Sequence, residues 1–66
     1  MDRDILFEKR EGIATITLNR AAARNAMTLG MAATLTSIVQ RLRGDHDVRV
    51  VVLQGAGTDF TVGADL

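Results

Sequence analysis

An almost unbroken run of β-branched residues, followed at once by a glycine-rich segment, is the feature that most constrains this chain. The run covers Val48 to Leu53, Gln54 to Asp59 show neither helical nor strand periodicity, and Thr61 to Asp65 are again small residues. A continuous apolar run of this length is typical of a strand buried on both faces, the usual state of a central parallel strand. Ligands bind beyond the carboxyl ends of such strands, where small residues let them approach backbone N–H groups. We therefore expect this segment to act mainly through its backbone.

The N-terminal part of the chain predicts a β-hairpin. We expect one strand over Ile5–Arg10 and a second over Ile13–Asn19, in which apolar and mixed positions alternate. Glu11 and Gly12 between them are typical of a tight hairpin turn. The charged end of the first strand favours an edge position in the sheet.

A helix is predicted between the hairpin and the valine-rich strand. Ala21 to Ala26 favour a loop or single turn, and Thr28 is a suitable N-cap for a helix that extends to Arg43, before Gly44. Its expected apolar stripe contains Leu29, Ala32, Leu35, Ile38 with Val39, and Leu42. The order strand, strand, helix, strand predicts an α/β fold that contains a right-handed βαβ unit.

Length and composition limit the classes of protein. A chain of 66 residues that is 47% apolar is too hydrophobic to be disordered, yet has no cysteine with which to stabilise a small core. We expect a fragment of a larger domain or a protomer that needs neighbours, and the stop at Asp65-Leu66 within an unfinished loop favours the fragment. Its single histidine argues against a zinc site, and zero net charge argues against nucleic acid as a partner. With no membrane-length apolar run and no targeting segment, we expect a cytoplasmic location and no membrane partner.

The individual candidate residues leave several alternatives open. Gly55-Ala56-Gly57 matches neither the dinucleotide-binding nor the P-loop pattern, so an ordinary turn is favoured. His46 is interpreted as a solvated residue in a connector. Asp65 is either a catalytic carboxylate or, as we favour, the N-cap of a following helix. Met27 and Met31 are interpreted as core residues, whereas Arg20 and Arg24 are equally compatible with an anion contact and with solvated loop charges.

Two segments, taken together, resemble a known family. Ile16-Thr17-Leu18-Asn19-Arg20 followed by Arg24-Asn25-Ala26-Met27 resembles the "LNRP…NAL/NAM" signature of the enoyl-CoA hydratase/isomerase (crotonase) family. The segment from Val50 to Gly57, followed by Asp59 to Leu66, resembles that family's "VVLTGAG" and "F-(S/C)-A-G-A-D-L" signature. The order and spacing of the two segments fit as well, and the resemblance extends from about Ile5 to the end of the sequence.

The resemblance implies a fold and a substrate. It implies that residues 1–66 are the N-terminal part of a single crotonase-like domain, a spiral of repeated ββα units, in a protein that assembles as a homo-trimer or hexamer. The implied reaction is hydration of 2,3-enoyl-CoA thioesters, a lyase reaction of fatty acid metabolism in which acyl-coenzyme A is the substrate and no further cofactor or metal takes part. Another reaction of the family, such as isomerisation, hydrolysis or decarboxylation, and a non-catalytic remnant or interaction module are the alternatives.

The resemblance also assigns roles to residues. The backbone N–H of Ala64 corresponds to one donor of the family's oxyanion hole, and the implied substrate-binding residues are Ala22, Arg24, Asn25, Gly63, Ala64 and Asp65. The second donor and the general acid and base lie beyond the position of Leu66 in the family, so we expect the 66 residues alone to be inactive. The sequence departs from the family pattern at Ala21, in place of proline, and at Thr61-Val62, in place of Ser/Cys-Ala.

Overall fold

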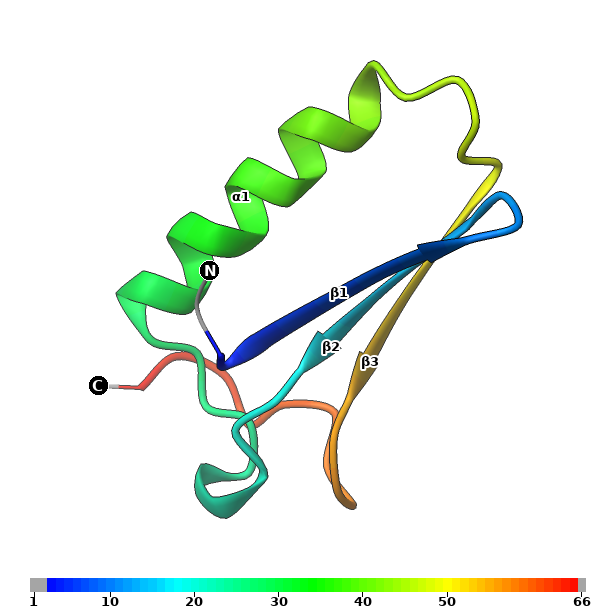
Figure 1. Cartoon of the computed structure of the whole chain (residues 1–66). Coiled ribbons are helices and arrows are strands. Elements are labelled where there is room, and N and C mark those ends of the chain that lie inside the picture. The colour runs from blue at the N-terminus through cyan, green and yellow to red at the C-terminus, as the bar shows by residue number, and fades with distance from the viewer. Residues whose placement is uncertain (1–2, 66) are drawn as a thin grey trace.

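A single long helix crosses one face of a three-stranded sheet in the computed structural model, which describes residues 3–65 (Figure 1). The strands lie in the order β1-β2-β3, so the hairpin pairs with the last strand through β2. The described chain thus has two layers, one helical and one of sheet. This arrangement confirms the predicted α/β order of hairpin, helix and parallel strand.

The hairpin follows the prediction closely. β1 covers Ile5–Arg10 and β2 covers Ile13–Leu18, paired antiparallel from Ile5 opposite Leu18 to Arg10 opposite Ile13. The two turn residues, Glu11 and Gly12, have φ angles of 52° and 81°. A two-residue turn with positive φ at both positions matches the twist of the flanking strands, and glycine reaches that conformation without strain. β1 is an edge strand, as its charged end predicted.

The helix begins and ends where the capping residues predict. A short 3₁₀ helix, η1, covers Ala21–Ala23, and α1 covers Leu29–Arg43. The Thr28 hydroxyl oxygen accepts a hydrogen bond from the Met31 N–H at 3.0 Å, while the Thr28 N–H donates to the Met31 sulfur at 3.5 Å. The backbone N–H groups of Thr28 and Met31, which have no hydrogen-bond partner within the helix, are therefore both satisfied by the other residue's side chain. Gly44 follows as the C-cap, with an ordinary negative φ.

The core lies between α1 and the sheet, and one part of the predicted helix stripe is wrong. The buried core residues are Ile5, Ile16, Leu18, Met31 and Ile38, with Phe7, Met27, Leu35 and Leu42 packed against them. Leu29 is 91% exposed, and Ala32 and Val39 are also exposed. Leu29 precedes Met31 by two positions, which is about 200° around a helix, so it faces away when Met31 faces the sheet. Both methionines pack in the core, as expected.

The last strand differs from the prediction in its position and exposure. β3 covers Val50–Gly55 and pairs in parallel with β2, from Ile13 opposite Val50 to Leu18 opposite Gly55. Pairing continues through Gln54 and Gly55, which the sequence had indicated as a turn. We expected a central strand buried on both faces, but β3 is the second edge of the sheet, and its apolar side chains are 37–52% exposed. No described element covers them, and Phe60 in the following loop is likewise half exposed.

Candidate functional site

Two loops meet beyond the carboxyl ends of β2 and β3 (Figure 1). Residues 19–28, here called the asparagine loop, follow β2, and residues 56–65, here called the glycine loop, follow β3. Because β2 and β3 are parallel neighbours, their carboxyl ends open at the same edge of the sheet. The sequence places the candidate site residues in these two loops, and the contacts described below join them.

Asn25 is the residue that joins the two loops. Its side chain is fully buried, and its backbone φ of 58° lies in the left-handed region, which asparagine tolerates better than most residues. Its Oδ1 atom accepts a hydrogen bond from the Arg20 N–H at 2.8 Å. Its Nδ2 atom donates to the carbonyl oxygens of Ala56 at 2.9 Å and Asp59 at 2.8 Å. One amide side chain therefore fixes a turn in its own loop and holds the start of the glycine loop.

The glycine at the end of β3 makes this close approach possible. A Cβ atom at Gly55 would lie 2.4 Å from the Phe60 carbonyl oxygen, 2.5 Å from the Asp59 carbonyl oxygen and 2.8 Å from Asn25 Nδ2. Such distances are far inside van der Waals contact, so any side chain here would push the loops apart. Gly55 is required because the glycine loop folds back over the end of its own strand.

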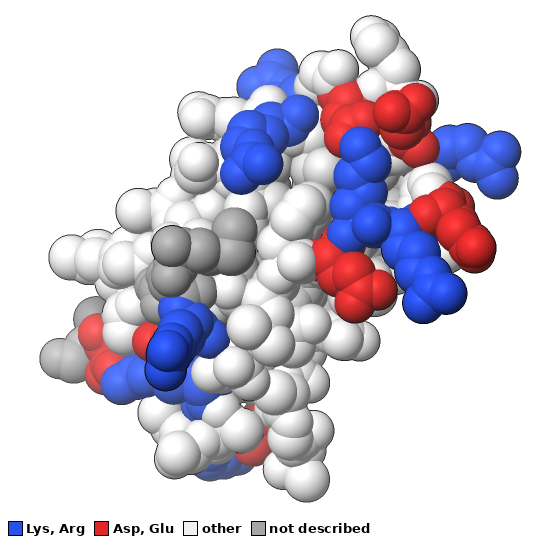
Figure 2. Space-filling view, in the orientation of Figure 1, with Lys and Arg blue, Asp and Glu red and all other residues white. Residues whose placement is uncertain are grey.

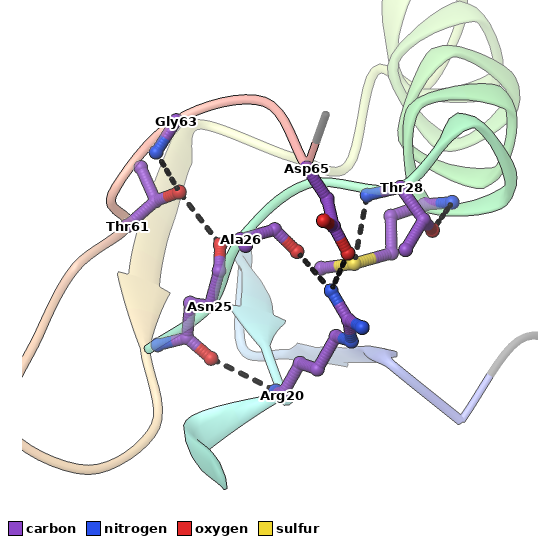
Figure 3. Close-up of polar contacts among 8 residues, drawn as sticks. Arg20, Asn25, Ala26, Thr28, Thr61, Gly63 and Asp65 are labelled. Carbon is purple, nitrogen blue, oxygen red and sulfur yellow. Dashed lines mark hydrogen bonds and ion pairs between the residues drawn. The ribbon is translucent and has the colours of Figure 1, made fainter. Parts of the chain in front are cut away.

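Thr61 carries the connection along the glycine loop. Its hydroxyl donates to the Asn25 carbonyl oxygen at 2.6 Å and accepts from the Gly63 N–H at 3.1 Å (Figure 3). Gly63 itself has a φ of 101°, a conformation that strongly favours glycine. The chain therefore reaches Ala64 in a direction set by Thr61 and by a glycine-specific bend.

An isolated parallel β-bridge between Met27 and Ala64 sets the direction of the Ala64 N–H. The Met27 N–H donates to the Gly63 carbonyl oxygen, and the Asp65 N–H donates to the Met27 carbonyl oxygen, both at 2.8 Å. In a parallel bridge of this kind the middle residue turns its own N–H to the opposite side. The Ala64 N–H therefore points away from the asparagine loop, and no group among residues 3–65 accepts a hydrogen bond from it. Ala64 is also exposed.

Two arginines of the asparagine loop pair with two aspartates of the glycine loop. Arg20 Nη1 lies 2.7 Å from Asp65 Oδ2, and it also donates to the Ala26 carbonyl oxygen at 3.0 Å (Figure 3). Arg24 donates from Nε and Nη2 to the two carboxylate oxygens of Asp59, at 3.2 and 3.3 Å. Hydrogen bonds from the Arg24 guanidinium hold the pKa of Asp59 below its ordinary value of 3.8, and the same pair raises the pKa of Arg24. Both arginines thus have anionic partners within the chain.

The structure brings together most of the residues that the sequence had selected. Arg24, Asn25, Gly63, Ala64 and Asp65 all lie where the two loops meet, whereas Ala22 is exposed on η1 and takes part in none of the hydrogen bonds described above. The side chain of Asn25 is directed into the protein rather than toward solvent. The roles of these residues in substrate binding and catalysis stay predictions.

Sequence reasoning missed the roles of Asn25, Asp59 and Thr61 as connecting residues. Asn25 binds Ala56 and Asp59 across 31 and 34 positions of the chain, and no local pattern reveals such contacts. The one available signal is a polar residue among small ones between two predicted elements. The described residues end at Asp65, so its predicted role as the N-cap of a following helix stays untested, and its carboxylate accepts a hydrogen bond from Arg20.

The surface around the site offers few other groups for chemistry. Most Lys and Arg side chains on the face shown in Figure 2 lie near Asp or Glu side chains. Within residues 3–65, no three His, Cys, Asp or Glu side chains gather as metal ligands would, and no helix is long and apolar enough to cross a membrane. His46 is exposed in its connector, as expected.

Comparison with known proteins gives consistent matches. The family model of enoyl-CoA hydratase/isomerase matches residues 8–66. The chain is 45% identical over 64 residues to the probable enoyl-CoA hydratase echA12 of Mycobacterium leprae, covering 97% of this chain and 22% of that protein. It is 40% identical over 63 residues to the enoyl-CoA hydratase EchA19 of Mycobacterium tuberculosis, covering 96% of this chain and 24% of that protein.

A solved structure supports the same comparison. The enoyl-CoA hydratase/isomerase of Marinobacter aquaeolei is similar with a TM-score of 0.91 and 39% identity, over 97% of this chain and 24% of that one. The neighbours with which the chain aligns have the crotonase fold, in agreement with the predicted fold class. The chain spans about a quarter of the length of the curated relatives it matches.

Proposed function

Because the chain belongs to the enoyl-CoA hydratase/isomerase family, we propose that it forms part of an acyl-CoA enzyme in which the Ala64 N–H binds the thioester carbonyl oxygen. The proposal rests on membership of the family and on the position of this one backbone donor. The reaction it favours is hydration of a 2,3-enoyl-CoA thioester.

One observation carries the proposal. Ala64 is an exposed residue, its N–H has no acceptor among residues 3–65, and this N–H is turned away from the asparagine loop because the residues on both sides of Ala64 bond to Met27. A preorganised N–H in this state is a donor that needs no rearrangement before it meets an oxygen. Gly63, with no side chain and a positive φ, leaves room for a ligand beside the donor.

The donor would act on charge that develops during the reaction. When water adds to C3 of the enoyl group, the electron pair of the C2–C3 double bond moves toward C1, and negative charge collects on the thioester oxygen. A hydrogen bond from the Ala64 N–H stabilises that oxygen more in the enolate than in the substrate, which lowers the barrier. The proton lost by water and the proton gained by C2 need a base and an acid that we do not assign to the described residues.

Arg24 is the proposed contact for the nucleotide portion of coenzyme A. It lies on the exposed side of the asparagine loop, and its guanidinium has donors beyond the two that Asp59 uses. A phosphate approaching this loop would share the Arg24 guanidinium with the Asp59 carboxylate or displace that carboxylate from it. The exposed Ala22 contributes its backbone to the same proposed surface. Asn25 is fully buried, so its proposed part in binding is to hold the asparagine loop in place, and Asp65 is proposed to contribute as the neighbour of Ala64.

The test replaces a single N–H group. L-lactic acid incorporated at position 64 of the protein encoded by the natural gene converts the amide N–H to an ester oxygen and leaves the methyl side chain in place. The bond from the Asp65 N–H to Met27 is unchanged, and the Gly63 carbonyl oxygen still accepts from the Met27 N–H, although as an ester carbonyl it is a weaker acceptor. Loss of one such donor lowers kcat about 10²- to 10³-fold in comparable sites.

A matched variant, Ala64→Gly, keeps the N–H and removes the methyl group, so it should retain most of the hydration rate with crotonyl-CoA. Equal rates for the ester variant and the unsubstituted protein would refute the proposed role of the donor. If the unsubstituted protein does not hydrate enoyl-CoA but turns over another acyl-CoA, a different family reaction replaces hydration. Absence of any acyl-CoA binding would favour a non-catalytic role.

A further inference from the structure

A single guanidinium ties together the two chain segments that form the Met27–Ala64 bridge. Arg20 Nη1 donates to the Ala26 carbonyl oxygen in the asparagine loop and to the Asp65 carboxylate in the glycine loop. Ala26 precedes Met27 and Asp65 follows Ala64, so the cation joins the residues that flank the bridge on its two sides (Figure 3). We propose that Arg20 is a positioning residue for the Ala64 donor, acting through Asp65.

Arg20 is itself held in place on its own loop. Its N–H donates to Asn25 Oδ1 at 2.8 Å, and its carbonyl oxygen accepts from the N–H groups of Ala23 at 3.0 Å and Asn25 at 2.9 Å. The backbone of Arg20 is thus fixed by the fully buried Asn25, and the side chain extends from this fixed base across to Asp65. A rigid base is what allows a long side chain to set the position of another segment.

The glycine loop needs such a support near Ala64. The bridge consists of two backbone hydrogen bonds, and the residue before Ala64 is Gly63, which has the greatest backbone freedom of any residue. The charge-assisted bond from Arg20 to Asp65, at 2.7 Å, is at the short and strong end of its range. Without this bond, the Gly63-Ala64-Asp65 segment could rotate and move the Ala64 N–H out of alignment with the thioester oxygen. A displacement of 1 Å can lower the rate about 100-fold.

A second ion pair provides a matched control. Lys9 Nζ and Asp45 Oδ2 are also 2.7 Å apart, and the exposed fractions of the two side chains, 39% and 23%, compare with 30% and 45% for Arg20 and Asp65. This pair joins β1 to the connector after α1, away from both loops of the site. Lys9→Gln therefore removes an equivalent surface ion pair without touching the segment that carries Ala64.

Besides the rate of hydration, the experiment measures two properties in the protein encoded by the natural gene. The first is polarisation of a bound thioester carbonyl, followed as the red shift in absorbance of a 4-aminocinnamoyl-CoA probe. The second is the hydrogen-exchange rate of the Asp65 amide, which donates to Met27. Arg20→Gln should reduce the red shift, lower kcat about tenfold to 100-fold with little change in KM, and speed exchange at Asp65. Lys9→Gln should leave all three at the unsubstituted values.

Two further variants show whether Arg20 acts through Asp65. Asp65→Asn should reproduce most of the effect of Arg20→Gln, which also removes the bond to the Ala26 carbonyl oxygen. The double variant should lose no more than Arg20→Gln alone, because both single variants remove the Arg20–Asp65 interaction. Arg20→Lys, which keeps the charge but not the forked geometry, should recover part of the red shift. Additive losses, or a red shift unchanged in Arg20→Gln, would overturn the inference.

The carbonyl readout rests on the proposed function, and the exchange readout does not. If the unsubstituted protein neither shifts the probe nor hydrates enoyl-CoA, while Arg20→Gln still speeds Asp65 exchange relative to Lys9→Gln, the ion pair positions the segment and the proposed function is wrong. If Asp65 exchange is the same in all of these variants, the positioning role is wrong whatever the protein catalyses.

Discussion

Replacing Asn25 with alanine should destabilise the protein more than any other polar-to-alanine change in the two loops. The substitution removes three side-chain hydrogen bonds, one to the Arg20 N–H and two to the carbonyl oxygens of Ala56 and Asp59. Each such bond contributes about 1 kcal/mol. Alanine at a φ of 58° adds roughly 1 kcal/mol of backbone strain. We expect the free energy of unfolding to fall by about 4 kcal/mol, a large share of the 5–15 kcal/mol typical of a domain.

Asn19→Ala is the matched control for this prediction. Asn19 is the other asparagine of the chain, is exposed, and makes one side-chain hydrogen bond, to the Arg3 carbonyl oxygen at 3.1 Å. Its removal should change the free energy of unfolding by no more than about 0.5 kcal/mol. Urea unfolding of the protein encoded by the natural gene, followed by circular dichroism, measures both variants. Similar small losses for Asn25→Ala and Asn19→Ala would refute the argument that Asn25 holds the loops together.

Three further predictions follow from the same geometry. Gly55→Ala should destabilise the protein by about 1–3 kcal/mol, because its Cβ would clash with the Phe60 and Asp59 carbonyl oxygens, whereas Gly44→Ala, with nothing within 4 Å, should be neutral or slightly stabilising in the same urea assay. The pKa of Asp59 is lowered in the folded state, so its contribution to stability is present above the ordinary value of 3.8 and is lost as pH falls through the folded-state pKa. Thermal unfolding midpoints of Asp59→Asn should therefore decline less steeply below that pH than those of the unsubstituted protein, and parallel curves would contradict the ion pair. The 66 residues alone should not hydrate crotonyl-CoA, because the one carboxylate next to Ala64 is bound by Arg20, and measurable turnover by the pure peptide would disprove this.

Local patterns in the sequence were sufficient to predict most of the secondary structure. The bounds of β1, the Glu11-Gly12 turn and the Thr28 cap follow from alternation, turn chemistry and capping preferences, which act between near neighbours. β3 begins two residues later than predicted because its extent is set by pairing with β2, a contact across more than thirty positions. β3 is more exposed than predicted for a similar reason, because whether a strand is covered depends on elements that are distant in the sequence.

The candidate site was predictable in its location but not in its internal connections. A glycine-rich segment after a parallel strand indicated where a ligand would bind, and the resemblance to a family selected Ala64. The direction of the Ala64 N–H depends on the bridge to Met27, and the loop positions depend on Asn25 and Arg20. These contacts join residues that are far apart in the chain, so composition, periodicity and spacing do not reveal them.

The most direct test of the central claim is the infrared carbonyl band of an enoyl-CoA labelled with ¹³C at C1 and bound to the protein. A hydrogen bond from the Ala64 N–H weakens the C=O bond, so the band should move to lower frequency on binding, and the ester variant at position 64 should reverse a large part of that shift. A shift of the same size in both proteins would show that the Ala64 N–H does not bind the thioester oxygen.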